Sequence, residues 1–365
     1  MQQETALVLK MRRRINIINI IDLLCQNDFF NAGTISILFT CKIFYFDNDI
    51  WKYIVNKPFF KNNDSILLLF CKNMGRRGIS YTSFFDKRFN FLLNLSNVNY
   101  TSKYGNTALT YASQNGSVPI VKGLISKGVN INHTKQYETS PLILATEKNH
   151  IGVVKELIKE GCNINHKKTY NYTAFMFACK FGFIEILRIL IDSGADINAK
   201  SSSGYTGFLY ACEEGHLEIF NILVNKGIDL EYSDSNGNTA LVLACKKEKI
   251  EIVKRLIELK VNLDIMSTSV IPPIIQACQN GNLELLDLLL NSGANINIST
   301  SVYHSCNNGL IYASIRGHLN IVKKLIQKNI NISYLNMYNH SALYYAKEHN
   351  NKKIVKLLTK YNIVN

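Results

Sequence analysis

Residues 173–200 read TAFMFACKFGFIEILRILIDSGADINAK, and this stretch contains every part of a unit that recurs along the chain. A short apolar segment around Ala178 is followed by a longer apolar segment and then by Gly194. The apolar residues fall on one side of a helix in each segment, so the stretch predicts two helices joined by a tight turn. Gly194 lies where a positive φ ends the second helix, a conformation that glycine adopts without steric cost.

The unit repeats at a fixed interval. The small residue at its centre recurs every 33 residues, with one interval of 36, at Ala112, Ala145, Ala178, Ala211, Ala244, Ala277, Ala313 and Ala346. Glycine follows sixteen residues later at Gly128, Gly161, Gly194, Gly227 and Gly293, whereas Lys260 and Asn329 replace it in two units. A lysine there costs about 1 kcal/mol in a left-handed conformation. Such a period indicates a stack in which each unit packs only on its neighbours.

The text around each alanine resembles the ankyrin repeat. TALTYA at 107–112, TAFMFA at 173–178 and TALVLA at 239–244 match the family's T-P-L-H-x-A, and His150, His216 and His318 occupy its Gly-His position. The resemblance implies an all-α ankyrin-repeat solenoid of helix-turn-helix pairs with β-turn fingers, in which Thr107, Thr173, Thr206 and Thr239 cap the first helices.

Two departures from the family motif affect the fingers. The motif's histidine, which ties neighbouring fingers together in the family, is absent from all units, so we expect less rigid fingers. Three extra residues within 297–308 predict one longer finger.

Three segments are expected along the chain. Residues 103–365 form eight repeats, and residues 63–102 form a degenerate capping repeat with one helix at 65–74 and a second beginning at Phe84. Residues 1–62 form a small helical N-terminal region.

The segment 35–55, ISILFTCKIFYFDNDIWKYIV, resembles the second half of an F-box. The resemblance implies a bundle that binds a Skp1-type adaptor through Ile37, Leu38 and Trp51, as a substrate receptor of a ubiquitin ligase would. The family's opening Leu-Pro and its acidic residue are absent, so the match covers half of the motif. The alternative is a helical cap that covers the apolar edge of the first repeat, with Trp51 in its core.

Composition narrows the remaining possibilities. The net charge of +14 is spread along the chain without a dense basic block, so we expect no nucleic-acid partner. Neither a membrane span nor a signal peptide is predicted, which favours the cytoplasm or the nucleus, or the host cytosol for a virus or an intracellular bacterium. The abundance of Asn, Ile, Lys and Tyr is similar to that of ankyrin proteins from AT-rich protists and large DNA viruses.

The positions of the cysteines and histidines predict structural side chains, and no disulfide or metal site. Cys179, Cys212, Cys245 and Cys278 are also 33 residues apart. Equivalent atoms in stacked helices lie about 8–10 Å apart, too far for a disulfide or a shared zinc ion. Because the sequence also lacks a phosphate-binding loop and any recognisable catalytic motif, we expect no metal, no cofactor and no enzymatic activity.

A partner protein is expected on the concave face that fingertips and first helices build in this family. The fingertip slot holds Tyr104, Tyr137 and Tyr170, and neighbouring slots add Lys148, Tyr172, Lys180, Phe181 and Tyr205. Tyrosine supplies a large contact area at low entropic cost. A general preference for tyrosine in the genome is the alternative explanation. We expect the protein to be a monomer.

Replacing Tyr104, Tyr137 and Tyr170 together by serine should leave the melting transition nearly unchanged, because fingertip side chains are not needed for the core. The same variant should capture less partner in a pull-down. Unchanged capture would show that the fingertips do not form the binding face.

Overall fold

The computed structural model describes residues 19, 48–56, 65–74 and 83–361. It divides into two compact units, which are described separately: residues 1–169 with 192–195, and residues 170–191 with 196–365. In the described part all regular elements are helices, and only isolated β-bridges occur in the loops. The all-α repeat fold predicted from the sequence is confirmed.

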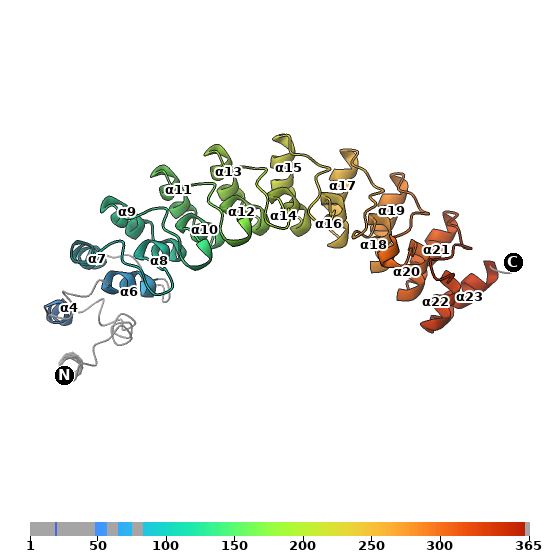
Figure 1. Ribbon diagram of the computed structural model, residues 1–365, viewed down its shortest axis with the longest axis horizontal. Coiled ribbons are helices and arrows are strands. Elements are labelled where there is room, and N and C mark those ends of the chain that lie inside the picture. The colour runs from blue at the N-terminus through green and yellow to red at the C-terminus, as the bar shows by residue number, and fades with distance from the viewer. Residues whose placement is uncertain (1–18, 20–47, 57–64, 75–82, 362–365) are drawn as a thin grey trace, which may run out of the picture. The chain divides into compact units, whose positions relative to one another are not determined.

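Unit 1 begins with three helices that precede the first full repeat: α4 (Asn48–Val55), α6 (Ser65–Met74) and α7 (Ser83–Leu95). The two repeats that follow are α8 (Ala108–Asn115) with α9 (Val118–Ser126), and α10 (Pro141–Glu147) with α11 (Ile151–Lys159). Helix α6 packs on α8 and α7 packs on α9, so the α6–α7 pair occupies the position of a preceding repeat (Figure 1). The predicted helices of this segment are observed, and the domain boundaries stay predictions.

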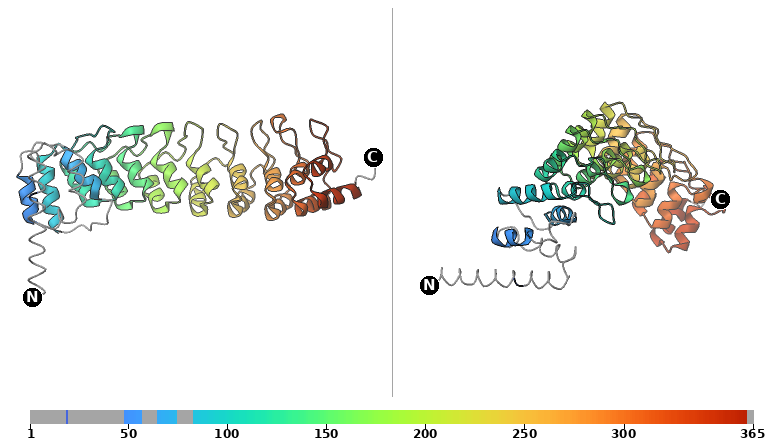
Figure 2. Two further views of the ribbon diagram at one scale, coloured as in Figure 1. Left: turned by 90° about the horizontal axis from the view of Figure 1, so that it is seen from below. Right: turned by 60° about the vertical axis from the view of Figure 1, so that its left-hand side comes forward.

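Unit 2 contains six further helix pairs in the same arrangement. They are α12 (Ala174–Phe181) with α13 (Ile184–Asp192), α14 (Gly207–Glu214) with α15 (Leu217–Asn225), α16 (Ala240–Lys246) with α17 (Ile250–Glu258), α18 (Pro273–Asn280) with α19 (Leu283–Asn291), α20 (Gly309–Arg316) with α21 (Leu319–Gln327), and α22 (Ala342–Glu348) with α23 (Lys352–Tyr361). First helices pack on first helices and second on second, which gives two rows joined by loops on one side (Figures 1 and 2).

The core of each repeat is a short apolar set that recurs in register. Ala178, Ala211 and Ala244 are fully buried, which lets adjacent first helices approach closely. The second helices from α9 to α21 each bury a triplet in an i, i+1, i+4 pattern, such as Ile186, Leu187 and Leu190 in α13, whereas α23 buries only Ile354 and Leu358. Cys179, Cys212, Cys245 and Cys278 are free thiols without exposed surface. Burial raises the pKa of each of these thiols well above its ordinary value. The thiols therefore stay uncharged and act as packing residues.

The helix ends follow the predicted chemistry. The hydroxyls of Thr107, Thr173, Thr206 and Thr239 each accept a hydrogen bond from the backbone N–H three residues later. The glycines that end the second helices have positive φ, and Lys260 and Asn329 adopt the same conformation at φ 59° and 61°. No atom lies within 4 Å of a Cβ placed on Gly227 or Gly293, so backbone strain is the only penalty for a side chain at this slot.

Polar side chains join successive loops. Asn99 and Asn132 accept hydrogen bonds from the backbone N–H groups of Asn130 and Asn163, each at 2.8 Å. In unit 2 the same position is taken by Glu231, Asp264 and Asn297. The fingers are tied as well, because His133, His166, Tyr232 and Tyr334 each reach a carbonyl of the preceding finger. Side chains at another position thus link successive fingers where the motif histidine is absent, and the rigidity of the fingers stays a prediction.

The longer finger between α19 and α20 is also observed. It carries a 3₁₀ turn at Val302–His304, and its base is closed by a bridge between Ser299 and Asn308. The three additional residues are accommodated in the loop, so the helix pairs on either side keep their packing.

Lys260→Gly should stabilise the repeat formed by α16 and α17. The left-handed backbone costs a lysine about 1–2 kcal/mol, and the greater freedom of glycine in the unfolded chain offsets part of the gain. We expect a net gain of roughly 0.5–1 kcal/mol in urea unfolding. Asn329→Gly is the matched control and should gain less, because asparagine tolerates this conformation better than lysine. A lower unfolding midpoint for Lys260→Gly would contradict this reasoning.

Candidate functional site

The aromatic cluster of unit 2 is a series of six contacting rings, defined as Tyr172, Phe177, Phe181, Phe183, Tyr205 and Tyr210. It extends from Phe183 through Phe181 and Phe177 to Tyr172, with ring centroids 5.6–6.0 Å apart. It continues to Tyr210 at 6.1 Å and to Tyr205 at a further 4.8 Å. These distances lie in the range at which aromatic pairs attract each other.

The repeat register explains how this cluster forms. Phe177 and Tyr210 each lie one residue before a buried alanine, in adjacent first helices. Tyr172 and Tyr205 precede the capping threonines of the same two helices. Because α12 packs on α14, these four residues come from equivalent positions in neighbouring repeats and meet between them.

Polar contacts hold the rings in place. The hydroxyl of Tyr210 donates a hydrogen bond to the hydroxyl of Tyr172 at 2.8 Å. The ammonium group of Lys180 lies 5.3 Å from the centre of the Tyr210 ring, within cation–π range. Tyr205 is hydrogen-bonded to Glu213, which also forms an ion pair with Lys247 at 3.6 Å. The cluster is thus a partly buried aromatic surface, with the positive charge of Lys180 and the negative charge of Glu213 at its edge.

Exposure differs along the cluster. Tyr210 is buried, with 6% of its surface exposed, whereas Phe181 is 46% exposed. Tyr172, Phe177, Phe183 and Tyr205 are intermediate. The sequence predicted Tyr172, Lys180, Phe181 and Tyr205 as partner-binding residues, and the structure brings these four together. Phe177, Phe183 and Tyr210 were missed, although aromatic residues one position before Ala178 and Ala211 were a visible signal.

The fingertip tyrosines are the most exposed of the predicted residues. Tyr170 in unit 2 is 71% exposed, and Tyr104 and Tyr137 in unit 1 are 55% and 67% exposed. Tyr137 and Tyr170 have φ angles of 63° and 65°, in the left-handed region that bulky residues rarely occupy. Such a conformation costs on the order of 1 kcal/mol, so neither side chain contributes to folding through its burial or its backbone geometry. Lys148, the remaining predicted residue, is exposed in unit 1.

Of the three residues predicted to contact a Skp1-type adaptor, only Trp51 lies in the described part of the chain. Ile37 and Leu38 lie outside the described residues. Trp51, in α4, is 8% exposed and packs edge-on against Phe91 of α7, and the guanidinium group of Arg88 lies 5.1 Å from its ring centre. This burial is what the cap interpretation requires of Trp51. The F-box resemblance stays a prediction.

The histidines that recur at the start of the second helices have a structural role, since each contacts a backbone carbonyl of the preceding repeat. His216 contacts the carbonyl of Lys180 through Nε2 at 3.0 Å, and a Cβ on Gly182 would lie 2.7 Å from its ring. His150 and His318 have equivalent partners in Gln114 and Gln279. Within the residues that the structure describes, no group of three His, Cys, Asp or Glu side chains could hold a metal ion. Over the same residues, no helix is long and apolar enough to cross a membrane.

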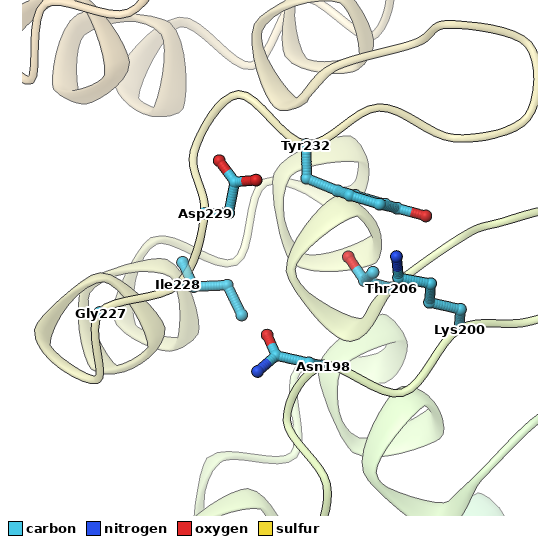
Figure 3. A pocket seen from close by; sticks show the side chains of 7 residues that line it. All are labelled: Asn198, Lys200, Thr206, Gly227, Ile228, Asp229 and Tyr232. Carbon is cyan, nitrogen blue, oxygen red and sulfur yellow. The ribbon is translucent and has the colours of Figure 1, made fainter.

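A second feature of unit 2 is a pocket of ≈ 330 Å³ between the loops after α13 and α15. Its lining residues are Asn198, Lys200, Thr206, Gly227, Ile228, Asp229 and Tyr232 (Figure 3). Lys200 lies 4.3 Å from the ring centre of Tyr232, whose hydroxyl donates to the carbonyl of Gly204. Asp229 accepts a hydrogen bond from the backbone N–H of Glu231. The polar groups of the pocket therefore serve the loops themselves, and no nucleophile is paired with a base among them.

The repeated helix pairs, the fingers and their capping residues can now be compared with known proteins. A family model described as ankyrin repeats (3 copies) matches residues 39–135, 77–168, 124–201, 175–269 and 274–365. The chain belongs to the ankyrin-repeat family. Ankyrin repeats are generally protein-interaction modules.

A solved structure with the same fold is the ankyrin repeat domain of human ASB11. It is 23% identical, with a TM-score of 0.54, and the similarity covers 61% of this chain and 98% of that one. No curated protein sequence matches this ankyrin-repeat chain. The comparison of structures supports the fold alone.

The pH dependence of stability should report on Tyr205. Burial raises the pKa of its phenol above the ordinary 10.0, and the carboxylates of Glu213 and Asp234 raise it further. Because the folded-state pKa lies above the unfolded one, this contribution to stability is complete below pH 10 and is lost as the pH rises through the folded value. Tyr205→Phe should therefore lose less stability than the parent between about pH 9 and about pH 11 in urea unfolding. Parallel losses would show that Tyr205 does not contribute.

Proposed function

We propose that this chain is a non-catalytic scaffold that binds a partner protein on the aromatic cluster of unit 2. The proposal is supported by the cluster itself, in which Tyr172 contacts both Phe177 of α12 and Tyr210 of α14 while Phe181 remains 46% exposed. The core of these repeats is complete without the exposed rings, because alanine, cysteine and the buried second-helix residues fill it.

The physical state of the cluster favours binding. Ring-to-ring packing and the bond between Tyr210 and Tyr172 hold the side chains in place before a partner arrives. Little side-chain entropy is then lost on association, which is a main cost of forming an interface. Aromatic residues in partly buried, preorganised groups are also the residues that most often dominate binding energy.

The fingertip tyrosine of the same unit extends this surface. Tyr170 is exposed and has a positive φ, so its side chain contributes nothing to the core. A residue that is unfavourable for the backbone and exposed to solvent is better explained by contact with a partner than by folding. Tyr104 and Tyr137 of unit 1 have the same character, and we propose the same role for them.

Phe181→Ser should weaken partner binding by about 30-fold, the effect of losing a central aromatic contact of about 2 kcal/mol. The partner is first identified by photo-crosslinking from a benzophenone side chain at position 181, and its affinity for purified variants is then measured by calorimetry. Tyr361→Ser is the matched control, because Tyr361 is 53% exposed and lies outside the cluster.

Phe181→Ser should lower the unfolding midpoint slightly, because it removes ring contacts with Phe177 and Phe183, so a circular dichroism melt must show that both variants are folded at the assay temperature. If Phe181→Ser binds the crosslinked partner as tightly as the parent, or if both variants lose affinity equally, the aromatic cluster is not the binding surface.

A further inference from the structure

Three ion pairs join successive repeats on the outer face of the second helices in unit 2. Arg188 of α13 pairs with Glu218 of α15 at 3.1 Å, and Lys254 of α17 pairs with Glu284 of α19 at 3.8 Å. In both cases the basic residue lies ten positions after the repeat alanine, and the acid lies seven positions after the next one. Asp287 of α19 reverses the sign and pairs with Lys324 of α21 at 2.5 Å.

The pattern of opposite charges is lost between the last two repeats. Residues 288–361 contain nine Lys or Arg residues and a single acidic residue, Glu348. Lys323 occupies the basic position, but the corresponding acidic position in α23 is Lys353. Lys356 occupies the basic position of α23, and no helix follows it in the described part of the chain. Positive charge therefore accumulates at the end of unit 2 that α22 and α23 form.

The same end exposes apolar side chains that every other repeat buries. The residue nine positions after the repeat alanine is fully buried from Val121 to Val322, but Val355 is only partly buried. Leu343 is also only partly buried, where Leu310 and its equivalents are buried. Tyr344 is 42% exposed, whereas Ile311 at the equivalent position has no exposed surface.

Lys347 completes this end face. It occupies the slot that Cys179, Cys212, Cys245 and Cys278 fill in the middle of unit 2, and it is exposed. The end face, defined as Leu343, Tyr344, Lys347, Val355 and Lys356, thus combines an apolar centre with two ammonium groups (α22 and α23 in Figures 1 and 2). The ring of Tyr344 is stacked on His340 at 3.8 Å, and its hydroxyl is hydrogen-bonded to Glu348, the one carboxylate beside this face.

We propose that the end face binds an amphipathic helical segment of a partner protein that has apolar residues on one side and carboxylates beside them. Such a segment would continue the stack, with its apolar residues on Leu343, Tyr344 and Val355 and a carboxylate at Lys356. This is the relationship that Glu284 of α19 has to Lys254 of α17, three interfaces earlier. The apolar centre favours a polypeptide over a nucleic acid, because phosphate groups bind lysine but gain nothing from exposed Leu343 and Val355.

The proposal does not depend on the aromatic cluster. The end face lies on α22 and α23, and the cluster lies on and around α12 and α14, so variants of one surface leave the other intact. Failure of either proposal would leave the other standing.

The chain provides its own probe. Helix α19 is acidic on the side where Glu284 and Asp287 lie, and it buries Leu285, Leu286 and Leu289. A fluorescein-labelled peptide with the sequence of residues 281–296 should bind the full chain, as measured by fluorescence anisotropy at low salt. A control peptide carrying Glu284→Gln and Asp287→Asn should bind about tenfold more weakly.

Two variants of the full chain separate the end face from bulk charge. Lys347→Glu with Lys356→Glu should weaken binding of the acidic peptide at least tenfold, and Val355→Thr should weaken it about threefold. Arg316→Glu with Lys323→Glu is the matched control, because it makes the same change in charge one repeat earlier and should retain binding within about threefold.

All four substituted lysines and arginines are exposed, and a circular dichroism melt checks that each variant is folded. Equal losses in the two double variants, or equal binding of the two peptides, would overturn the proposal. Tighter binding of a single-stranded oligonucleotide than of the acidic peptide at the same residues would also overturn it.

Discussion

The constraint on which this structure depends is that no helix pair can bury its apolar side by itself. Each first helix is one short segment with a buried alanine, and each second helix from α9 to α21 buries only a triplet such as Ile186, Leu187 and Leu190. The only surface available to cover these residues is the next pair along the chain. Stability is therefore local, and it is supplied by many equivalent contacts between neighbours and not by one central core.

That constraint explains which parts of the sequence are repetitive and which are free to vary. Residues that face a neighbour recur with the period of the repeat, including the buried alanines, the cysteine row and the loop residues that accept hydrogen bonds from the following loop. The fingertip tyrosines Tyr104, Tyr137 and Tyr170 are exposed and do not belong to this buried set. Aromatic residues at the fingertips and unbalanced lysines at the C-terminal repeats are thus candidates for function, because the stack does not require them.

The cost of departing from the repeat is also local. Lys260 replaces a glycine in a left-handed conformation, and the missing motif histidines are replaced by His133, His166, Tyr232 and Tyr334 at another position. In both cases the helix pairs on either side keep their packing. A solenoid tolerates such changes because a defect in one repeat affects only its two interfaces.

The sequence by itself determined the fold, the helix ends and the burial of the cysteines, because a period of 33 residues fixes which residues occupy equivalent positions. It also indicated Tyr172, Lys180, Phe181 and Tyr205 as surface residues of the same repeats. Only the tertiary structure decided that Phe177, Phe183 and Tyr210 join them, that Trp51 is buried against Phe91, and that the ion pairs end before α23. The physical reason is that a repeat period gives the register of the backbone, whereas contacts between side chains depend on the direction each one takes from neighbouring helices.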